Sequence, residues 1–324
     1  MSSLTEEKRA AWLTAQRDRE ATARQALAEG VTALTQRQGW VQWLDLAGRL
    51  PQYSVGNHLL LMHQLPDASM VMSADQWRQV GRWPRRGSTA LRIWAPRRGR
   101  ATQAGEDQGE GDASKADEKG AAQQRRVRFV LVPVFDVSQT EGSALPARPT
   151  PVAPPEGSAP AGMWDAMVGY AATAGYRVEL GRTGAADGLT NFRTQTITIS
   201  PGGSELSQTL TLAHEIGHMS LHADLLDNIH RGRAEVQAES VAYLVAAEYG
   251  LAQAADWHFD YLAHWAAQVG GDTGDVVSAE VRDSASGVMT AARPLLEHLL
   301  DAGVGYPDAP AHAPAPPTVR EVSR

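Results

Sequence analysis

The residues of this sequence that are best suited to chemistry are two histidines and a glutamate in the segment HEIGH, residues 214–218. Side chains four residues apart lie on one face of a helix, so both imidazoles can reach one tetrahedral zinc ion. Glu215 lies beside them, where it can take a proton from water at the metal. An apolar run, residues 210–221, surrounds the segment, and a β-rich run, residues 194–200, precedes it. The pattern predicts a zinc site with Glu215 as the catalytic base, and the alternative is an ordinary amphipathic helix that carries two histidines.

A zinc ion of this kind needs a third protein ligand beside His214 and His218. The following helical segment offers Glu235 and Glu239, which lie one turn apart. We interpret Glu235 as the third metal ligand and Glu239 as the acceptor of a hydrogen bond from a ligand histidine. The reverse assignment stays open, and so does a plain charged helix face. His222 is interpreted as structural, because positions 214 to 222 span about 12 Å of a straight helix, too far for one ion.

A second group of residues lies in the N-terminal half, where arginine and tryptophan are concentrated. Residues 78–100 contain eight arginines and no acidic residue, and six of the nine tryptophans precede residue 95. Guanidinium groups contact phosphates and indole rings stack on bases, which suits single-stranded nucleic acid. The alternative is a core of tryptophans under a solvated arginine surface, and it is favoured for Trp12, Trp40 and Trp43. The residues predicted to bind DNA are Trp83, Arg82, Arg85, Arg86, Trp94, Arg97 and Arg98.

Charge and composition limit the class of protein. The net charge is −7, yet residues 1–140 hold 20 basic and 15 acidic residues, whereas residues 141–324 hold 10 and 22. A basic half before an acidic half favours a polyanionic partner for the first half alone. The absence of cysteine excludes disulfides, thiolate ligands and thiol nucleophiles. No apolar run is long enough to span a membrane, and the first residues do not resemble a secretory signal, so we expect a cytoplasmic protein without a membrane partner.

The elements that must position these residues fall into two predicted domains, because 324 residues exceed the size of most single domains. Periodicity, caps and β-rich runs predict an α+β protein. The first domain, residues 1–140, has helices at 5–39, 40–48, 58–65 and 73–80, and strands at 90–94 and 127–137 around an acidic disordered loop at 101–124. A Pro/Ala-rich linker spans 141–162. The second domain, residues 163–306, has helices at 163–175, 204–222, 233–249, 256–269 and 276–300, strands at 176–180 and 194–200, and a disordered tail at 307–324.

The segment HEIGHMSLH, followed by EVQAESVAYLVAAEYG, resembles the ImmA/IrrE type of gluzincin metallopeptidase. In that family the third zinc ligand is the glutamate of an E-x-x-A-[DN] pattern, which falls on Glu235 here. Glu239 stands where the family commonly has aspartate or asparagine. The resemblance covers residues 160–250 and implies a zincin fold with zinc-dependent peptide hydrolysis. Residues 194–200 are then expected to be the edge strand beside the cleft, able to pair with an extended peptide.

The segments YSVGNHLLL (53–61), QW (76–77) and GRWPRRG (81–87) resemble the N-terminal single-strand-binding domain of ArdC-type antirestriction proteins. Those proteins join this domain to a C-terminal metallopeptidase-like domain, in the order found here. The family's Lys/Arg-Gly-Glu-x-Gly turn is replaced by RGSTA at 86–90. The resemblance implies a mobile-element antirestriction protein whose partners are single-stranded DNA and a protein substrate or restriction enzyme. Two alternatives stay open: a non-catalytic DNA-binding protein with a structural zinc ion, and a regulatory metalloprotease that cleaves a repressor.

Overall fold

The computed structural model describes residues 3–98, 127–145, 154–223, 230–259, 262 and 274–305. Helices and strands are combined in these residues, which confirms the predicted α+β class. The predicted loop at 101–124 and the predicted tail at 307–324 lie outside the described residues. The helix predicted at 256–269 is not formed at 256–259, and most of its remainder is not described. Within the described ranges, no helix combines the length and apolar character that a membrane span requires.

Three helices begin the chain, namely α1 (Ser3–Ala33), α2 (Arg37–Arg49) and α3 (Val55–Gln64). The helix predicted for 5–39 ends early, because the chain turns at residues 34–36 before α2 begins. Gly39 makes this tight turn possible, since a Cβ atom there would lie 2.2 Å from the carbonyl oxygen of Ala33. At the start of α3, Ser54 accepts a hydrogen bond from the backbone N–H of Asn57, as an N-cap serine does.

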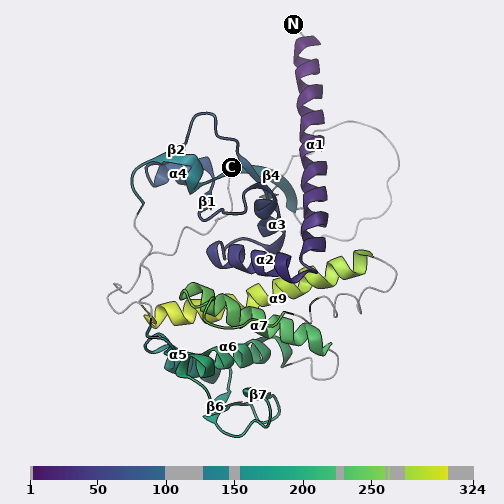
Figure 1. Cartoon of the computed structure of the whole chain (residues 1–324). Helices are drawn as coiled ribbons and strands as arrows, with labels where there is room; N and C mark the ends of the chain where they lie inside the picture. Colours follow the sequence, from purple (N-terminus) through teal and green to yellow (C-terminus); the bar gives the residue numbers. More distant parts are fainter. Residues whose placement is uncertain are drawn as a thin grey trace, which may run out of the picture.

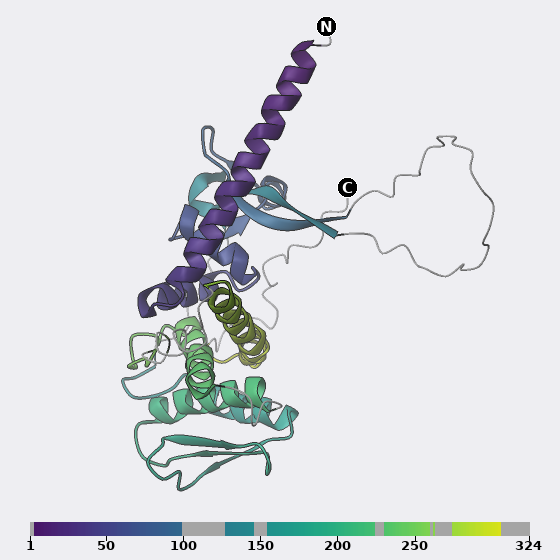
Figure 2. The same ribbon diagram turned by 90° about the vertical axis from the view of Figure 1, so that its right-hand side faces the viewer.

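The tryptophans of these helices lie in different environments. Trp40 and Trp43 are fully buried, and their predicted core positions are confirmed. Trp12 is 58% exposed, so its predicted core position is wrong. The first half of α1, which carries Trp12, projects beyond the rest of the molecule (Figures 1 and 2). Helical spacing alone could not reveal this, because the spacing defines a face but not the partner that covers it.

The strands of the N-terminal half form a long ribbon and two small pairings. Strands β3 (Leu91–Arg98) and β4 (Val127–Asp136) are antiparallel and confirm the strands predicted at 90–94 and 127–137. The buried side chains of Leu91, Ile93 and Val134 pack on residues of α2 and α3. The remaining elements are β1 (Val71–Met72), which pairs with β4, α4 (Ala74–Gln79) with the N-cap Ser73, and β2 (Arg82–Pro84), which pairs with β5 (Thr140–Gly142) after the 3-10 turn Val137–Gln139.

The C-terminal half stacks helices on a three-stranded sheet (Figure 1). Its elements are α5 (Met163–Thr173), β6 (Arg177–Leu180), β7 (Gly188–Asn191), β8 (Thr196–Ile199), α6 (Glu205–His222), α7 (Arg231–Glu248) and α9 (Gly274–Asp301). The strand order is β6-β8-β7, with β8 parallel to β6 and antiparallel to β7. The prediction that residues 194–200 form the edge strand is therefore wrong. Strand β8 is central because β7 pairs with the side of it that does not face β6. The sequence of β7 contains no long β-rich run, so this pairing was not expected.

One hydrophobic core joins the two halves of the chain. Residues of α2 and α3 share a cluster of buried side chains with α5, β8, α6, α7 and α9. Trp40 donates its indole N–H to the hydroxyl of Ser240 at 2.8 Å, and Tyr243 donates to Asp45 at 2.6 Å. Helix α7 thus lies between α2 and α6 (Figure 1). The predicted boundaries at 140 and 163 stay a prediction, and the halves that they separate share this core.

Part of the predicted linker is packed on the C-terminal half. Residues 146–153 are not described, but residues 154–162 are. The carbonyl of Gly157 accepts a hydrogen bond from the N–H of Leu206 at 3.0 Å, and Ala159 is buried. A proline-rich composition predicts low burial on average, whereas here a hydrogen bond to α6 and the burial of Ala159 show a packed segment.

Candidate metal centre and nucleic-acid surface

The two helices of the metal centre meet at small residues. Ser204 is the N-cap of helix α6, because its hydroxyl accepts a hydrogen bond from the N–H of Ser207. A Cβ atom on Gly217 would lie 2.8 Å from the Cα atom of Ala238 in α7. The glycine between the two histidines therefore allows α7 to lie close to α6. This approach brings Glu235, one turn before Ala238, over the histidine face of α6.

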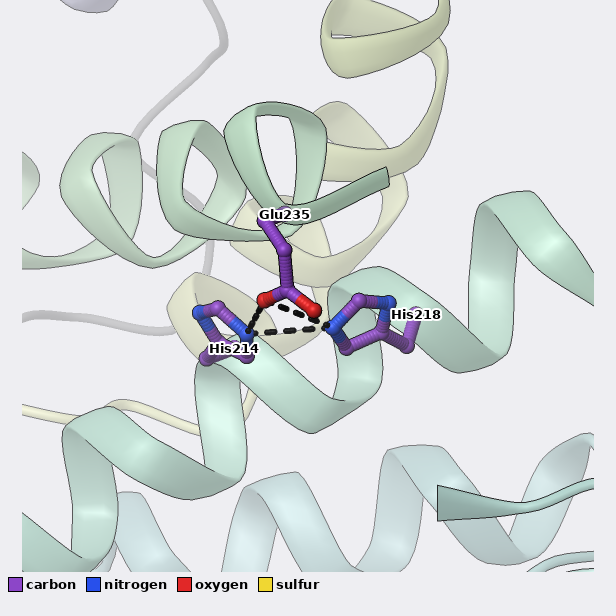
Figure 3. A group of neighbouring side chains, drawn as sticks. All are labelled: His214, His218 and Glu235. Atoms are coloured by element: carbon purple, nitrogen blue, oxygen red, sulfur yellow. Dashed lines mark hydrogen bonds and ion pairs between the residues drawn. The ribbon is translucent and has the colours of Figure 1, made fainter. Parts of the chain in front are cut away.

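His214, His218 and Glu235 point toward one another (Figure 3). The Nε2 atoms of the two histidines are 3.1 Å apart, and a carboxylate oxygen of Glu235 lies 3.5 Å from His214 Nε2 and 3.7 Å from His218 Nε2. In the described part of the chain, this is the one group of three or more potential donor residues whose donor atoms lie within 4.8 Å of one another. Two imidazoles and a carboxylate are a usual protein ligand set for zinc.

Glu239 holds His214 from the side opposite to Glu235. His214 Nδ1 donates to Glu239 Oε2 at 2.9 Å, because a carboxylate only accepts. In the neutral ring this leaves Nε2 without hydrogen, with its lone pair facing Glu235 and His218. The second oxygen of Glu239 accepts from the backbone N–H of His258 at 2.9 Å. The structure thus brings Glu239 to the position predicted for it, and a positive ion between the two Nε2 atoms fits this arrangement.

The charges of the cluster are coupled to one another. Burial lowers the pKa of His214, but hydrogen bonds to Glu235 and Glu239 and the charge of Glu215 outweigh this effect and raise the pKa to about 9. The contacts with the imidazoles of His214 and His218 hold the pKa of Glu235 well below its usual range. At neutral pH the negative carboxylate of Glu235 therefore lies against a protonated His214, and a bound metal ion would take the place of that proton. His222, one turn after His218, is different, because burial lowers its pKa to about 4 and leaves its ring neutral.

The predicted base, Glu215, lies under the edge strand β7. Thr190 donates its hydroxyl to Glu215 Oε2 at 2.6 Å, and the glutamate is only 6% exposed. A Cβ atom on Gly188 would lie 2.6 Å from Glu215 Oε1, so glycine is needed for the strand to pass this closely. Sequence reasoning missed Gly188 and Thr190, because the short segment GLTN carries no strand signal of its own.

A cleft of about 1330 Å³ opens beside these residues. Strand β7, residues 154–158, the start of α7 and residues 254–258 form its walls, and His214, Glu215, His218, Glu235 and Glu239 line it. The packed part of the predicted linker is therefore one rim of the cleft. Strand β7, which contributes to its wall, is an edge strand of the three-stranded sheet.

The first group of predicted DNA-binding residues lies on β2 and the turn after it. Trp83 is 50% exposed, and Arg85 and Arg86 are exposed beside it. Arg82 has a different environment, because its guanidinium donates to the hydroxyl and carbonyl of Thr140 and to the carbonyl of Ser143. The exposed Trp83 and Arg86 offer a ring and a cation to a ligand. Arg85 is exposed but also donates to the carbonyl of Ser138, and Arg82 fastens β2 to β5.

The second group lies toward the far end of the β3–β4 ribbon. Seven residues separate Leu91 from Arg98, which is roughly 23 Å of strand. Trp94 is half-buried and packs on residues of α1 and α3. Arg97 is exposed, and the side chain of Arg98 lies outside what the structure describes. The structure therefore does not bring the two predicted groups together at one point, and their DNA-binding roles stay predictions.

Phe129 is an exposed aromatic residue that sequence reasoning missed. Its side chain is 64% exposed, and it lies opposite Pro96 in the ribbon. The neighbouring residues Arg97 and Arg128 lie directly opposite each other, although like charges in this position repel. The apolar run VRFVLV concealed Phe129, because a strand pattern does not tell which face is solvated.

Two families match separate parts of the sequence. Residues 21–135 match the N-terminal domain of anti-restriction factor ArdC, and residues 176–268 match the IrrE N-terminal-like domain. Among solved structures, the chain is similar to the antirestriction ArdC protein from R388 plasmid. The metal-free structure is 20% identical with a TM-score of 0.47, and the Mn(II)-bound structure is 18% identical with a TM-score of 0.46. Each likeness covers 78% of this chain and 91% of the other. No curated protein matches the sequence.

Proposed function

We propose that this chain, which joins an ArdC-type N-terminal domain to an IrrE-like domain, is an antirestriction protein that binds single-stranded DNA and hydrolyses peptide bonds at a zinc site. The observation that carries the enzymatic part is the convergence of His214, His218 and Glu235 beside Glu215 in a cleft. The nucleic-acid part is supported by the exposed Trp83 and the arginines beside it.

The residues present fit a zinc ion. The Nε2 atoms of His214 and His218 and the carboxylate of Glu235 would hold it, and the cleft leaves the remaining position open to water and substrate. A bound zinc ion supplies Lewis acidity to water and to a peptide carbonyl. Glu239 orients His214 by accepting its Nδ1 hydrogen.

Glu215 is proposed to move the proton. Thr190 occupies its Oε2 atom, so Oε1 is the atom that takes a proton from the attacking water and delivers it to the departing amine nitrogen. The Thr190 hydrogen bond keeps the carboxylate in one orientation, and burial beneath β7 limits competing water. The outer edge of β7, which pairs with no strand in the described residues, can align an extended peptide beside these groups.

A pair of variants tests this proposal in the full chain. His218→Ala should remove zinc, measured by elemental analysis after dialysis, whereas Glu215→Gln should retain zinc and lose cleavage of a peptide library. Glu205→Gln is the matched control, because this glutamate lies exposed in the first turn of the same helix. Undiminished zinc in His218→Ala refutes the ligand assignment, and normal cleavage by Glu215→Gln refutes the base. DNA protection that survives Glu215→Gln favours the non-catalytic alternative.

A further inference from the structure

Beyond the proposed ligands, three buried polar groups form a chain behind His218. His218 Nδ1 lies 3.0 Å from His222 Nδ1, and His222 Nε2 lies 3.1 Å from Gln237 Oε1. Gln237 Nε2 in turn donates to the backbone carbonyl of Ser284 in α9, at 3.4 Å. His222 is 3% exposed, and Gln237 and Ser284 are buried as well. These groups lie away from the cleft, and none of them lines it.

The direction of each hydrogen bond in this series follows from its last group, the backbone carbonyl of Ser284. A backbone carbonyl can only accept, so the amide nitrogen of Gln237 must face Ser284 and its oxygen must face His222. His222 Nε2 therefore carries the hydrogen. In a neutral ring the other nitrogen is then bare, so His222 Nδ1 accepts from His218 Nδ1–H. His218 is left with its lone pair on Nε2.

That lone pair faces the position between His214 and Glu235. A histidine that carried its hydrogen on Nε2 instead would present an N–H there and could not ligate a metal. If each of these hydrogen bonds ran in the opposite direction, the Gln237 oxygen would face the Ser284 carbonyl, and two acceptors would repel each other. The geometry thus selects one tautomer of His218, and the selection originates in α9, outside the two metal-binding helices.

We propose that His222 and Gln237 are positioning residues that hold His218 in the tautomer able to bind the metal. The effect on metal binding rests on the proposed zinc site, whereas the tautomer itself can be measured without metal. The two histidine ligands are then held by different means, His214 by the carboxylate of Glu239 and His218 by a neutral imidazole.

Two matched substitutions of His222 distinguish the effect of its hydrogen-bond acceptor from the effect of the size of its ring. His222→Asn keeps an acceptor close to the position of Nδ1, whereas His222→Leu has a similar size and no acceptor. In ¹⁵N-histidine-labelled, metal-free full chain, His218 should carry its hydrogen on Nδ1 in the wild type and in His222→Asn. It should become a mixture of tautomers in His222→Leu, while the signals of His214 stay unchanged. Zinc titration against a competing chelator should show roughly 10–100-fold weaker binding for His222→Leu and a smaller loss for His222→Asn.

Gln237→Met tests the next step of the chain, because methionine has a similar length and accepts no strong hydrogen bond. This substitution should allow His222 to adopt either tautomer and should weaken zinc binding. Gln208→Met, on the surface of α6, should change neither the tautomer nor the zinc affinity. A hydrogen on Nε2 of His218 in the wild-type protein overturns the inference, and so does equal zinc affinity of His222→Leu and His222→Asn. Failure of the wild type to bind zinc refutes the proposed function, but the tautomer measurement still decides the inference.

Discussion

Acidification should destabilise this protein through His58, a histidine of α3 that is fully buried in the core. Its Nε2–H donates to the carbonyl of Leu50 at 2.9 Å, and its Nδ1 accepts from the indole of Trp43 at 3.3 Å. Both bonds are made by the neutral ring. Burial lowers the pKa of His58 to about 4; the Leu50 hydrogen bond opposes this shift, and the charge of Arg293 on α9 adds to it.

The size of this loss of stability follows from the difference between the pKa of His58 in the folded and in the unfolded chain. The pKa of His58 is lower in the folded protein than the value near 6.5 in the unfolded chain, so the unfolded chain binds the proton first as the pH falls. The contribution to stability is fully present above pH 6.5 and is lost between pH 6.5 and 4. Each unit of the pKa difference corresponds to about 1.4 kcal/mol, which gives a loss of about 2 kcal/mol at pH 5.

Urea unfolding followed by tryptophan fluorescence, at pH 7.5 and pH 5, measures this loss. His58→Gln should be less stable than the wild type at pH 7.5, because it loses bonds to Trp43 and Leu50. Between the two pH values it should lose about 2 kcal/mol less than the wild type does. His63→Gln is the control, because His63 is exposed on the same helix. An equal loss for wild type and His58→Gln would refute the reasoning.

The remaining predictions concern the metal centre and the DNA surface. Glu239→Ala should weaken zinc binding by roughly 10–100-fold and leave some zinc bound, as a chelator titration would show. Gly217→Ala should push α7 away from α6 and cost about 1–3 kcal/mol in urea unfolding of the metal-free chain. Trp83→Ala should weaken binding of a single-stranded oligonucleotide by about 1–3 kcal/mol in fluorescence anisotropy, with little change in salt dependence. The double change Arg85→Ala, Arg86→Ala should flatten that salt dependence.

A control or a contrary result tests each of these predictions. Complete loss of zinc in Glu239→Ala, with zinc retained in Glu235→Ala, would reverse the two glutamate assignments. Gly48→Ala should not destabilise, because the nearest atom to its Cβ would be 3.7 Å away. Arg177→Ala, an exposed arginine of the other half, should leave the DNA salt dependence unchanged. Equal affinity for duplex and single strand would argue against base stacking by Trp83.

The parts of the fold that the sequence predicted depend on local physics. The helix at 204–222 was predicted because Ser204 caps it and apolar residues recur at helical spacing, and both signals act within a few residues. The spacing of His214, His218, Glu235 and Glu239 is local in the same sense. Two pairs of residues one turn apart need only a close helix crossing to meet, and Gly217 permits it.

The parts that could not be predicted depend on which elements meet. Strand β7 is stabilised by its pairing with β8 and by the Thr190 hydrogen bond to Glu215, neither of which is visible in four residues of sequence. The same limit explains Trp12, whose helix extends past its partners. Arg82, which was predicted to bind DNA, is tied to β5, and Phe129, for which no role was predicted, is exposed, because exposure depends on neighbours distant in the chain.

Helix α7 has a double function in this architecture. Toward α6 it presents Glu235 to the histidines, and toward α2 it presents Ser240 and Tyr243, which bond Trp40 and Asp45. These contacts lie within about two turns of one helix, so the residue that faces the metal site and the residues that bond α2 are carried by the same element. The core around them is shared and close-packed, and a packed core transmits displacement rather than absorbing it. Separating the halves would also expose Trp40, which is why both the DNA-binding and the zinc-binding experiments require the full chain.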